Sequence, residues 1–324
     1  HARMGAVMAV AALLLGENVT SVYAAAIMIN DVNNYGYATG QAGGNKWSYL
    51  YNYNNPGNMG ALDGSATTGY YSGSALNGIS IGHNTKIQED SDPTYYSGVA
   101  IGDYAQATGG LSFSIGNYAQ STKPSAMALG TASLSSGFNS LAMMRQAAAT
   151  GNFSTAIGTT AWANGTGSFA MGYSAQAKGD QSIAIGAAEP ITVAGSGNEP
   201  SASYNGATNT VTEGARSLAF GTKARTEAAA SDSMAFGSNA KTKAANTVAM
   251  GNSSRATATD AFAFGNTAYA TGANAIAMGR TAQARQLNAI ALGGQAKALE
   301  ANALAIGGTA EASKAGTMAI GTAA

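Results

Sequence analysis

A five-residue phrase that returns every fourteen residues constrains this chain more than any other feature. It reads SFAMG at 168–172, SIAIG at 182–186 and AFAFG at 261–265. Twelve of the fifteen steps between successive phrases are fourteen residues long, and the other three are 20, 35 and 16 residues. Met144 stands where the period expects a closing glycine. A period this regular predicts a repeat architecture before any single helix or strand is assigned.

Inside the phrase, two bulky apolar residues flank a small one. Ile183 and Ile185 flank Ala184, for example, and the middle residue is Ala or Ser in all sixteen repeats. Residues two apart share one face of a β-strand, so the bulky pair lies on one face and the small residue on the other. The closing glycine is expected where the chain bends sharply.

A second, shorter alternation follows each phrase. Ala175 and Ala177 alternate with Gln176 and Lys178, which gives one small apolar face and one polar face. Such a strand is buried on one side only. Each repeat is therefore predicted to hold two short strands and two tight turns, and stacked repeats predict an all-β parallel solenoid.

The strand in the phrase has no polar face, so both of its faces need a partner. One face can fill the solenoid interior, and the other is then free to pack against sister chains. Periodicity alone leaves the direction of the two faces open, and we expect the bulky pair to point inward. The expected interior residues are Phe169, Met171, Ile183, Ile185, Phe262, Phe264, Ile276 and Met278. The expected interface residues, small enough to let another backbone approach, are Ala128, Ala156, Ala170, Ala184, Ala219, Ala235, Ala249, Ala263, Ala277, Ala291 and Ala305.

The segment SFAMGYSAQAKG at Ser168–Gly179 resembles the YadA-like head repeat of trimeric autotransporter adhesins. That repeat is an S-V-A-I-G phrase followed by A-x-A-x-G, and the resemblance extends from about Gly78 to Ala324. It implies a left-handed parallel β-roll assembled as a homotrimer. It also implies a protein anchored in the bacterial outer membrane that attaches cells to one another and to a host matrix protein such as collagen, or to a cell-surface receptor. The stalk and membrane anchor of that family are not recognisable here, so we expect a fragment.

The N-terminal part differs from the repeats. Residues 1–26 hold a basic Arg3, the apolar run Met8–Leu15 and small residues typical of a signal-peptide cleavage site. Residues 27–78 are rich in Asn, Gly and Tyr and are expected to cap the repeats of 79–324. The aromatic residues there either pack the cap or contact a ligand; these candidates are Trp47, Tyr49, Tyr51, Tyr53, Tyr70 and Tyr71.

Two insertions interrupt the period, at about 83–97 and 187–213. The first contains three acidic residues whose spacing matches no calcium loop, which favours a solvated loop. The second contains many turn-forming residues and predicts a projecting hairpin built from Ile191–Val193 and Thr210–Thr212. This hairpin is either a binding protrusion or a tolerated ornament.

Composition argues against an enzyme, a metal site or a cofactor. The chain has no cysteine and only two histidines, His1 and His83, and it carries none of the common catalytic motifs. Its 16 basic and 16 acidic side chains form no basic stripe in the sequence that would indicate nucleic-acid binding. Two alternatives to an adhesin remain. One is a trimeric phage or bacteriocin fibre, which would lack a signal peptide, and the more remote one is an acyltransferase-like β-helix, whose period is six.

Overall fold

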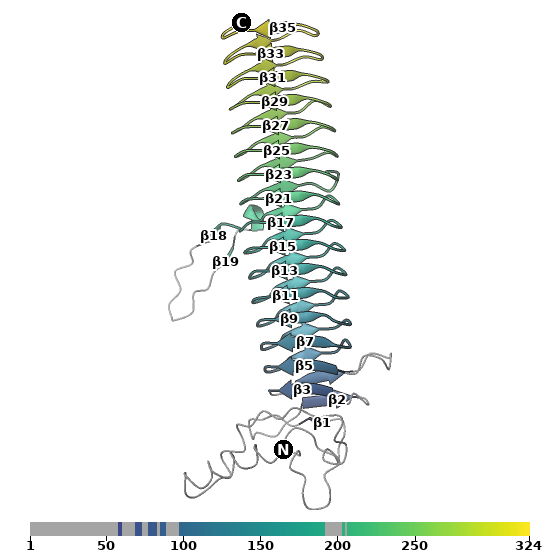
Figure 1. The fold of residues 1–324 in the computed structure, drawn as a ribbon. Helices are drawn as coiled ribbons and strands as arrows, with labels where there is room; N and C mark the ends of the chain where they lie inside the picture. Colours follow the sequence, from purple (N-terminus) through teal and green to yellow (C-terminus); the bar gives the residue numbers. More distant parts are fainter. Residues whose placement is uncertain are drawn as a thin grey trace, which may run out of the picture. The chain divides into compact units, whose positions relative to one another are not determined.

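The computed structural model describes residues 58–59, 69–72, 77–82, 85–88, 97–191, 203–204 and 206–324. The described residues form β-strands and one three-residue 3-10 helix, η4 (Gly206–Thr208), and contain no α-helix. The prediction of an all-β parallel solenoid is confirmed (Figure 1). The predicted signal peptide and the candidate ligand contacts Trp47, Tyr49, Tyr51 and Tyr53 lie outside the described residues.

The chain divides into two compact units, His1–Pro124 and Ser125–Ala324. In the first unit, β1 and β2 pair antiparallel, β2 pairs parallel with β4, and β3, β5 and β7 pair parallel in that order. Tyr70 and Tyr71 belong to β2. The strands of this unit are β1 (Asn58–Met59), β2 (Gly69–Ser72), β3 (Asn77–Ile81), β4 (Lys86–Gln88), β5 (Ser97–Ile101), β6 (Gln106–Ala107), β7 (Ser112–Ile115) and β8 (Gln120–Ser121).

In the second unit, the phrase strands of successive turns pair parallel and form one sheet, here called the phrase sheet. Each middle residue lies beside the middle residue of the next turn, as Ala263 lies beside Ala277. These strands are β9 (Met127–Leu129), β11 (Leu141–Met143), β13 (Thr155–Ile157), β15 (Phe169–Met171), β17 (Ile183–Ile185), β21 (Leu218–Phe220), β23 (Met234–Phe236), β25 (Val248–Met250), β27 (Phe262–Phe264), β29 (Ile276–Met278), β31 (Ile290–Leu292), β33 (Leu304–Ile306) and β35 (Met318–Ile320).

The two-residue strands between them form a second parallel sheet, here called the polar-faced sheet. It keeps the same register from turn to turn, as Lys241 pairs with Arg255 and Arg255 with Tyr269. These strands are β10 (Leu134–Ser135), β12 (Ala148–Ala149), β14 (Trp162–Ala163), β16 (Gln176–Ala177), β20 (Val211–Thr212), β22 (Arg225–Thr226), β24 (Lys241–Thr242), β26 (Arg255–Ala256), β28 (Tyr269–Ala270), β30 (Gln283–Ala284), β32 (Lys297–Ala298) and β34 (Glu311–Ala312).

Small side chains fill the space between the two sheets. Ala277 of the phrase sheet, Ala284 of the polar-faced strand that follows it and Ala282 just before that strand are all completely buried. Where Ser or Thr replaces Ala, many of the hydroxyls find a partner inside, as Ser182 Oγ does on Thr212 Oγ1 at 2.8 Å, whereas the hydroxyls of Ser168 and Thr242 have none. This interior is too narrow for Ile, Phe or Met.

The expectation that the bulky residues fill the roll is therefore wrong. Ile183, Met171, Phe264 and Met278 are 40–46% exposed in the single chain, and the other four are only partly buried: Ile185, Phe169, Phe262 and Ile276. The physical reason is that strands of two and three residues joined by tight turns bring the sheets close together. Only the small side chains of Ala, Ser and Thr fit between them.

Two kinds of backbone conformation shape the turns. The fifteen closing glycines have φ between 118° and 153°, and a Cβ added to Gly279 would overlap the backbone carbonyl of Gly293 in the next turn. The turns also hold residues in the left-handed region, where Asn is tolerated best. Asn274, Asn288 and Asn302 take such a conformation, and each amide donates to the next at 3.2 and 3.0 Å.

Met144 occupies the one turn of the period that lacks the closing glycine. Its φ of 87° is unfavourable for a side chain with a Cβ, and it is 50% exposed. Backbone strain of this kind costs on the order of 1–3 kcal/mol. Met144→Gly is therefore expected to raise the free energy of unfolding by about 1 kcal/mol, after the greater freedom of an unfolded glycine is subtracted. Denaturant unfolding measures this change.

The neighbouring Arg145 provides the control, because it is not among the residues with positive φ. Arg145→Gly gains no strain relief and is expected to lower stability. A loss of stability in both variants would contradict the assignment of strain to Met144.

Both insertions leave the strand register of the described residues intact; the shorter one lies between β3 and β5, which pair parallel. The longer one separates β17 from β20, and β20 returns to pair with β16. The predicted hairpin strands were misplaced: β18 (Pro190–Ile191) pairs antiparallel with β19 (Ser203–Tyr204), whereas Thr212 belongs to the solenoid. The 16-residue step is absorbed by an additional turn, in which Ala230 N donates to Glu227 O at 2.8 Å.

Candidate functional site

The outward side of the phrase sheet is a continuous apolar face. Each of its thirteen strands in the second unit directs two residues outward, and nearly all of them are Ile, Leu, Met, Phe or Val. Parallel pairing aligns them in two columns, so that Phe264 lies beside Met250 on one side and Met278 on the other. We call this surface the apolar face.

Aromatic rings stack along the apolar face. Phe220 and Phe236, on adjacent turns, lie with ring centroids 4.8 Å apart and planes 7° apart. Phe262 and Phe264, on one strand, are nearly parallel at 6.4 Å. Contiguous apolar surface of this extent is uncommon on a soluble monomer and marks an interaction site.

The predicted interface residues do not lie on this surface. All eleven Ala side chains named above, from Ala128 to Ala305, are completely buried within the single chain. A side chain enclosed by its own roll is not available to another chain, so that assignment is corrected. The residues on the accessible side are the bulky pairs, which were assigned to the interior.

The polar-faced sheet directs a different set of side chains outward. Arg225, Lys241 and Arg255 project from successive turns, Tyr269 follows in the same column, and Lys178 projects two turns before Arg225. Several of them form ion pairs: Glu213 accepts from Arg225 at 2.8 Å and lies 3.6 Å from Lys178, and Glu227 pairs with Lys241. The sequence alternation had shown Lys178 only as part of a polar face.

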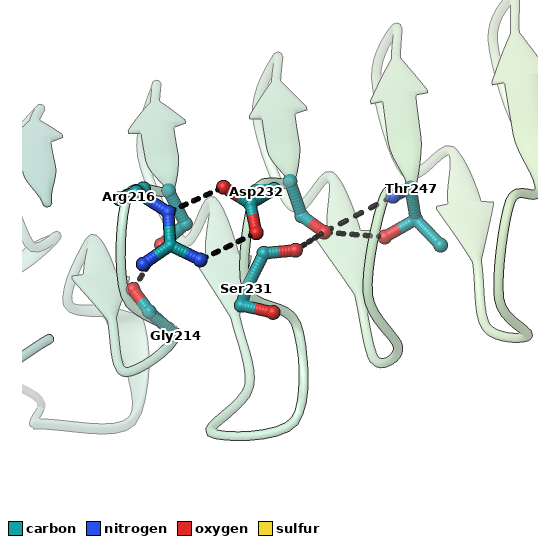
Figure 2. Close-up of polar contacts among 7 residues, drawn as sticks. Gly214, Arg216, Ser231, Asp232 and Thr247 are labelled. Carbon is teal, nitrogen blue, oxygen red and sulfur yellow. Dashed lines mark hydrogen bonds and ion pairs between the residues drawn. The ribbon is translucent and has the colours of Figure 1, made fainter.

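The turns that follow the polar-faced strands contain a bidentate ion pair. Arg216 donates from Nε to Asp232 Oδ1 at 2.6 Å and from Nη2 to Oδ2 at 2.7 Å (Figure 2). Both residues have positive φ and lie on adjacent turns, where other turns carry Gln181 and Asn246. The hydrogen bonds from Arg216, and then its charge, hold the pKa of Asp232 below its ordinary value of 3.8.

The lowered pKa of Asp232 gives this pair a defined pH dependence. A carboxyl whose pKa is lower in the folded state stabilises the fold above its unfolded pKa and loses that contribution as the pH falls through the folded value. Asp232→Asn is therefore expected to lower the melting temperature slightly at pH 7, because an exposed pair is screened by solvent. The difference from the parent should vanish at pH values well below 3.8. A difference that stays constant down to strong acid would contradict the role of this pair.

The described residues contain no group of three or more His, Cys, Asp or Glu side chains that could hold a metal ion. Among the same residues, no helix has the length and hydrophobicity needed to cross a membrane. The features that distinguish this part of the chain are therefore its two outward surfaces.

Comparison with known proteins identifies the repeats. The chain has no match among curated proteins. The family model described as YadA head domain repeat, which spans two copies of the repeat, matches nine overlapping segments within 135–188 and 228–324. These matches follow the fourteen-residue turns and include both strands of each turn. The repeats in these two segments therefore belong to the YadA head domain repeat family.

Proposed function

We propose that this chain is the head of a trimeric autotransporter adhesin, in which three copies bury their apolar faces against one another. The observation that carries the proposal is the apolar face itself, which a single chain leaves in contact with water along thirteen successive turns. Burying apolar surface contributes roughly 25 cal/mol per Å². Over this many turns, association with copies of the same chain is strongly favoured.

The proposal also explains why the roll interior consists of alanine. A narrow interior contributes little apolar burial per turn, because each Ala side chain is small. The bulky residues add their burial only when chains associate. Association of the chains then adds to the stability of turns that each chain forms on its own.

The function that follows is adhesion by multivalent contact, from a position on the bacterial cell surface with an outer-membrane anchor. Three copies of every exposed patch convert weak single contacts into durable attachment. The proposed partners are a host matrix protein such as collagen, a host cell-surface receptor and other copies of the adhesin on neighbouring cells. The family of the repeats and the parallel solenoid support a structural adhesin in place of an enzyme.

The first test is the absolute mass of the purified chain, by light scattering after size exclusion. The expected mass is three times that of one chain. The second is retention on immobilised collagen, where a trimer should bind about 10²-fold or more tightly than a dissociated chain. A stable monomer would overturn the assembly, and a trimer that adheres neither to collagen nor to host cells would overturn the proposed adhesion.

A further inference from the structure

A charged strip runs across five consecutive turns of the polar-faced sheet, on the opposite side of the roll from the apolar face. Its basic members are Lys178, Arg225, Lys241, Lys243 and Arg255, and its acidic members are Glu213 and Glu227. The strip thus has an excess of three positive charges, whereas the whole chain has 16 basic and 16 acidic residues. We call these seven residues the basic strip.

The positive charge is concentrated at one end of the strip. Glu213 lies between Lys178 and Arg225, and Glu227 pairs with Lys241, so the acidic residues pair with three basic residues on the first four turns. Within the described part of the chain, neither Lys243 nor Arg255 has a carboxylate partner, and both side chains are exposed. Arg255 instead lies over the ring of Tyr269, 5.6 Å from its centroid.

The solenoid register gives the strip a regular spacing. Arg225, Lys241 and Arg255 are direct neighbours in parallel strands, so their backbones follow one another at about 4.8 Å. Lys243 lies two residues beyond Lys241 and faces the same way. A ligand that fits this pattern is linear, carries repeated negative charges and lies along the stacking direction.

We propose that the basic strip binds a sulfated linear polysaccharide. The sulfate groups of such a polymer are tetrahedral oxyanions. Arginine guanidinium and lysine ammonium groups bind oxyanions by charge-assisted hydrogen bonds. A single-stranded nucleic acid would also need free aromatic surfaces for base stacking, but Tyr269 is already covered by Arg255. The proposal gives the adhesin proposed above a second class of ligand. It rests on that proposed function in one respect, which is that the strip is exposed at the cell surface.

The test uses the full chain and heparin as the probe, with the dissociation constant measured over a range of salt concentrations. Lys243→Gln combined with Arg255→Gln is expected to weaken heparin binding at least about tenfold at low salt. The slope of log affinity against log salt should fall by about two, one for each cation removed. The matched control is Arg280→Gln combined with Lys314→Gln, which removes two exposed positive charges from turns outside the strip and is expected to change affinity less than about twofold.

A third variant tests the role of the acidic residues. Glu227→Gln releases Lys241 and removes a negative charge, so it is expected to strengthen heparin binding. Equal losses in the strip variant and the control would overturn the proposal, as would a lack of binding or equal binding of desulfated heparin. Double-stranded DNA that binds as tightly and depends on the same two residues would overturn the choice of a polysaccharide.

These outcomes are separable from those of the assembly test. A monomeric chain that binds heparin through Lys243 and Arg255 would uphold the basic strip and reject the trimer. A chain that has the mass of a trimer but does not bind heparin would uphold the trimer and reject the basic strip.

Discussion

Ala277→Glu is expected to unfold the turns around β29 (Ile276–Met278). Ala277 is completely buried between the two sheets, in contact with other small side chains of the interior. Glutamate there is too large for the space and places a carboxylate without a partner in it. An uncompensated buried charge costs about 3–5 kcal/mol. Ala263→Glu, one turn earlier, should act in the same way.

The damage should be local, because each turn of a solenoid contacts only its neighbours. Hydrogen exchange of backbone amides is the suitable measurement: protection should be lost near residue 277 and kept in distant turns. Ala277→Ser is the control, since Ser114 occupies the equivalent position in β7 and donates to Gln106 O at 2.6 Å. An Ala277→Glu chain that keeps the protection and heat stability of the parent would refute the alanine interior.

The repeat predicted most of the fold because its signals are local and recur in every turn. Alternation in Ile183–Ile185 and the glycine at 186 specify a strand and its end wherever they occur. Stacking then follows, since a single turn cannot bury its own residues. The pairing of Ala263 with Ala277 is a direct consequence of the fourteen-residue step.

The direction of the two faces was not predicted, because alternation alone is symmetric. One signal in the sequence could have resolved it. The interior of a stacked roll must keep nearly the same width from turn to turn, and the middle position is always Ala or Ser. The flanking positions vary from Val248 to Phe262 in adjacent turns, a change in volume that a narrow interior would not accommodate.

The sequence also predicted the candidate sites only in part. The basic strip was not predicted because its members are scattered along the sequence between Lys178 and Arg255. They become neighbours only because β16 and β20, which the insertion at 187–213 separates in the sequence, pair in the structure. The expected contribution of Tyr70 and Tyr71 to ligand contact stays a prediction.

The apolar face leads to the second large effect, which is on assembly. Phe264 and Met278 are direct neighbours in the phrase sheet and are 44% and 43% exposed in the single chain. Phe264→Glu combined with Met278→Glu is expected to dissociate the proposed trimer into single chains. Each carboxylate forced into a dry interface without a partner costs about 2–5 kcal/mol, and each substitution is present three times.

The roll of each dissociated chain should remain folded near these residues, because their side chains point away from the alanine interior. Light scattering measures the mass, and hydrogen exchange around β27 (Phe262–Phe264) and β29 reports on the turns. The matched control is Thr271→Glu combined with Gln283→Glu, which adds the same two charges to the polar-faced sheet and should leave the mass unchanged. A double variant on the apolar face that still shows the mass of three chains would mean that this face is not where the chains meet. Dissociation in that variant alone would locate the subunit interface on the bulky columns and leave the polar-faced sheet free for ligands.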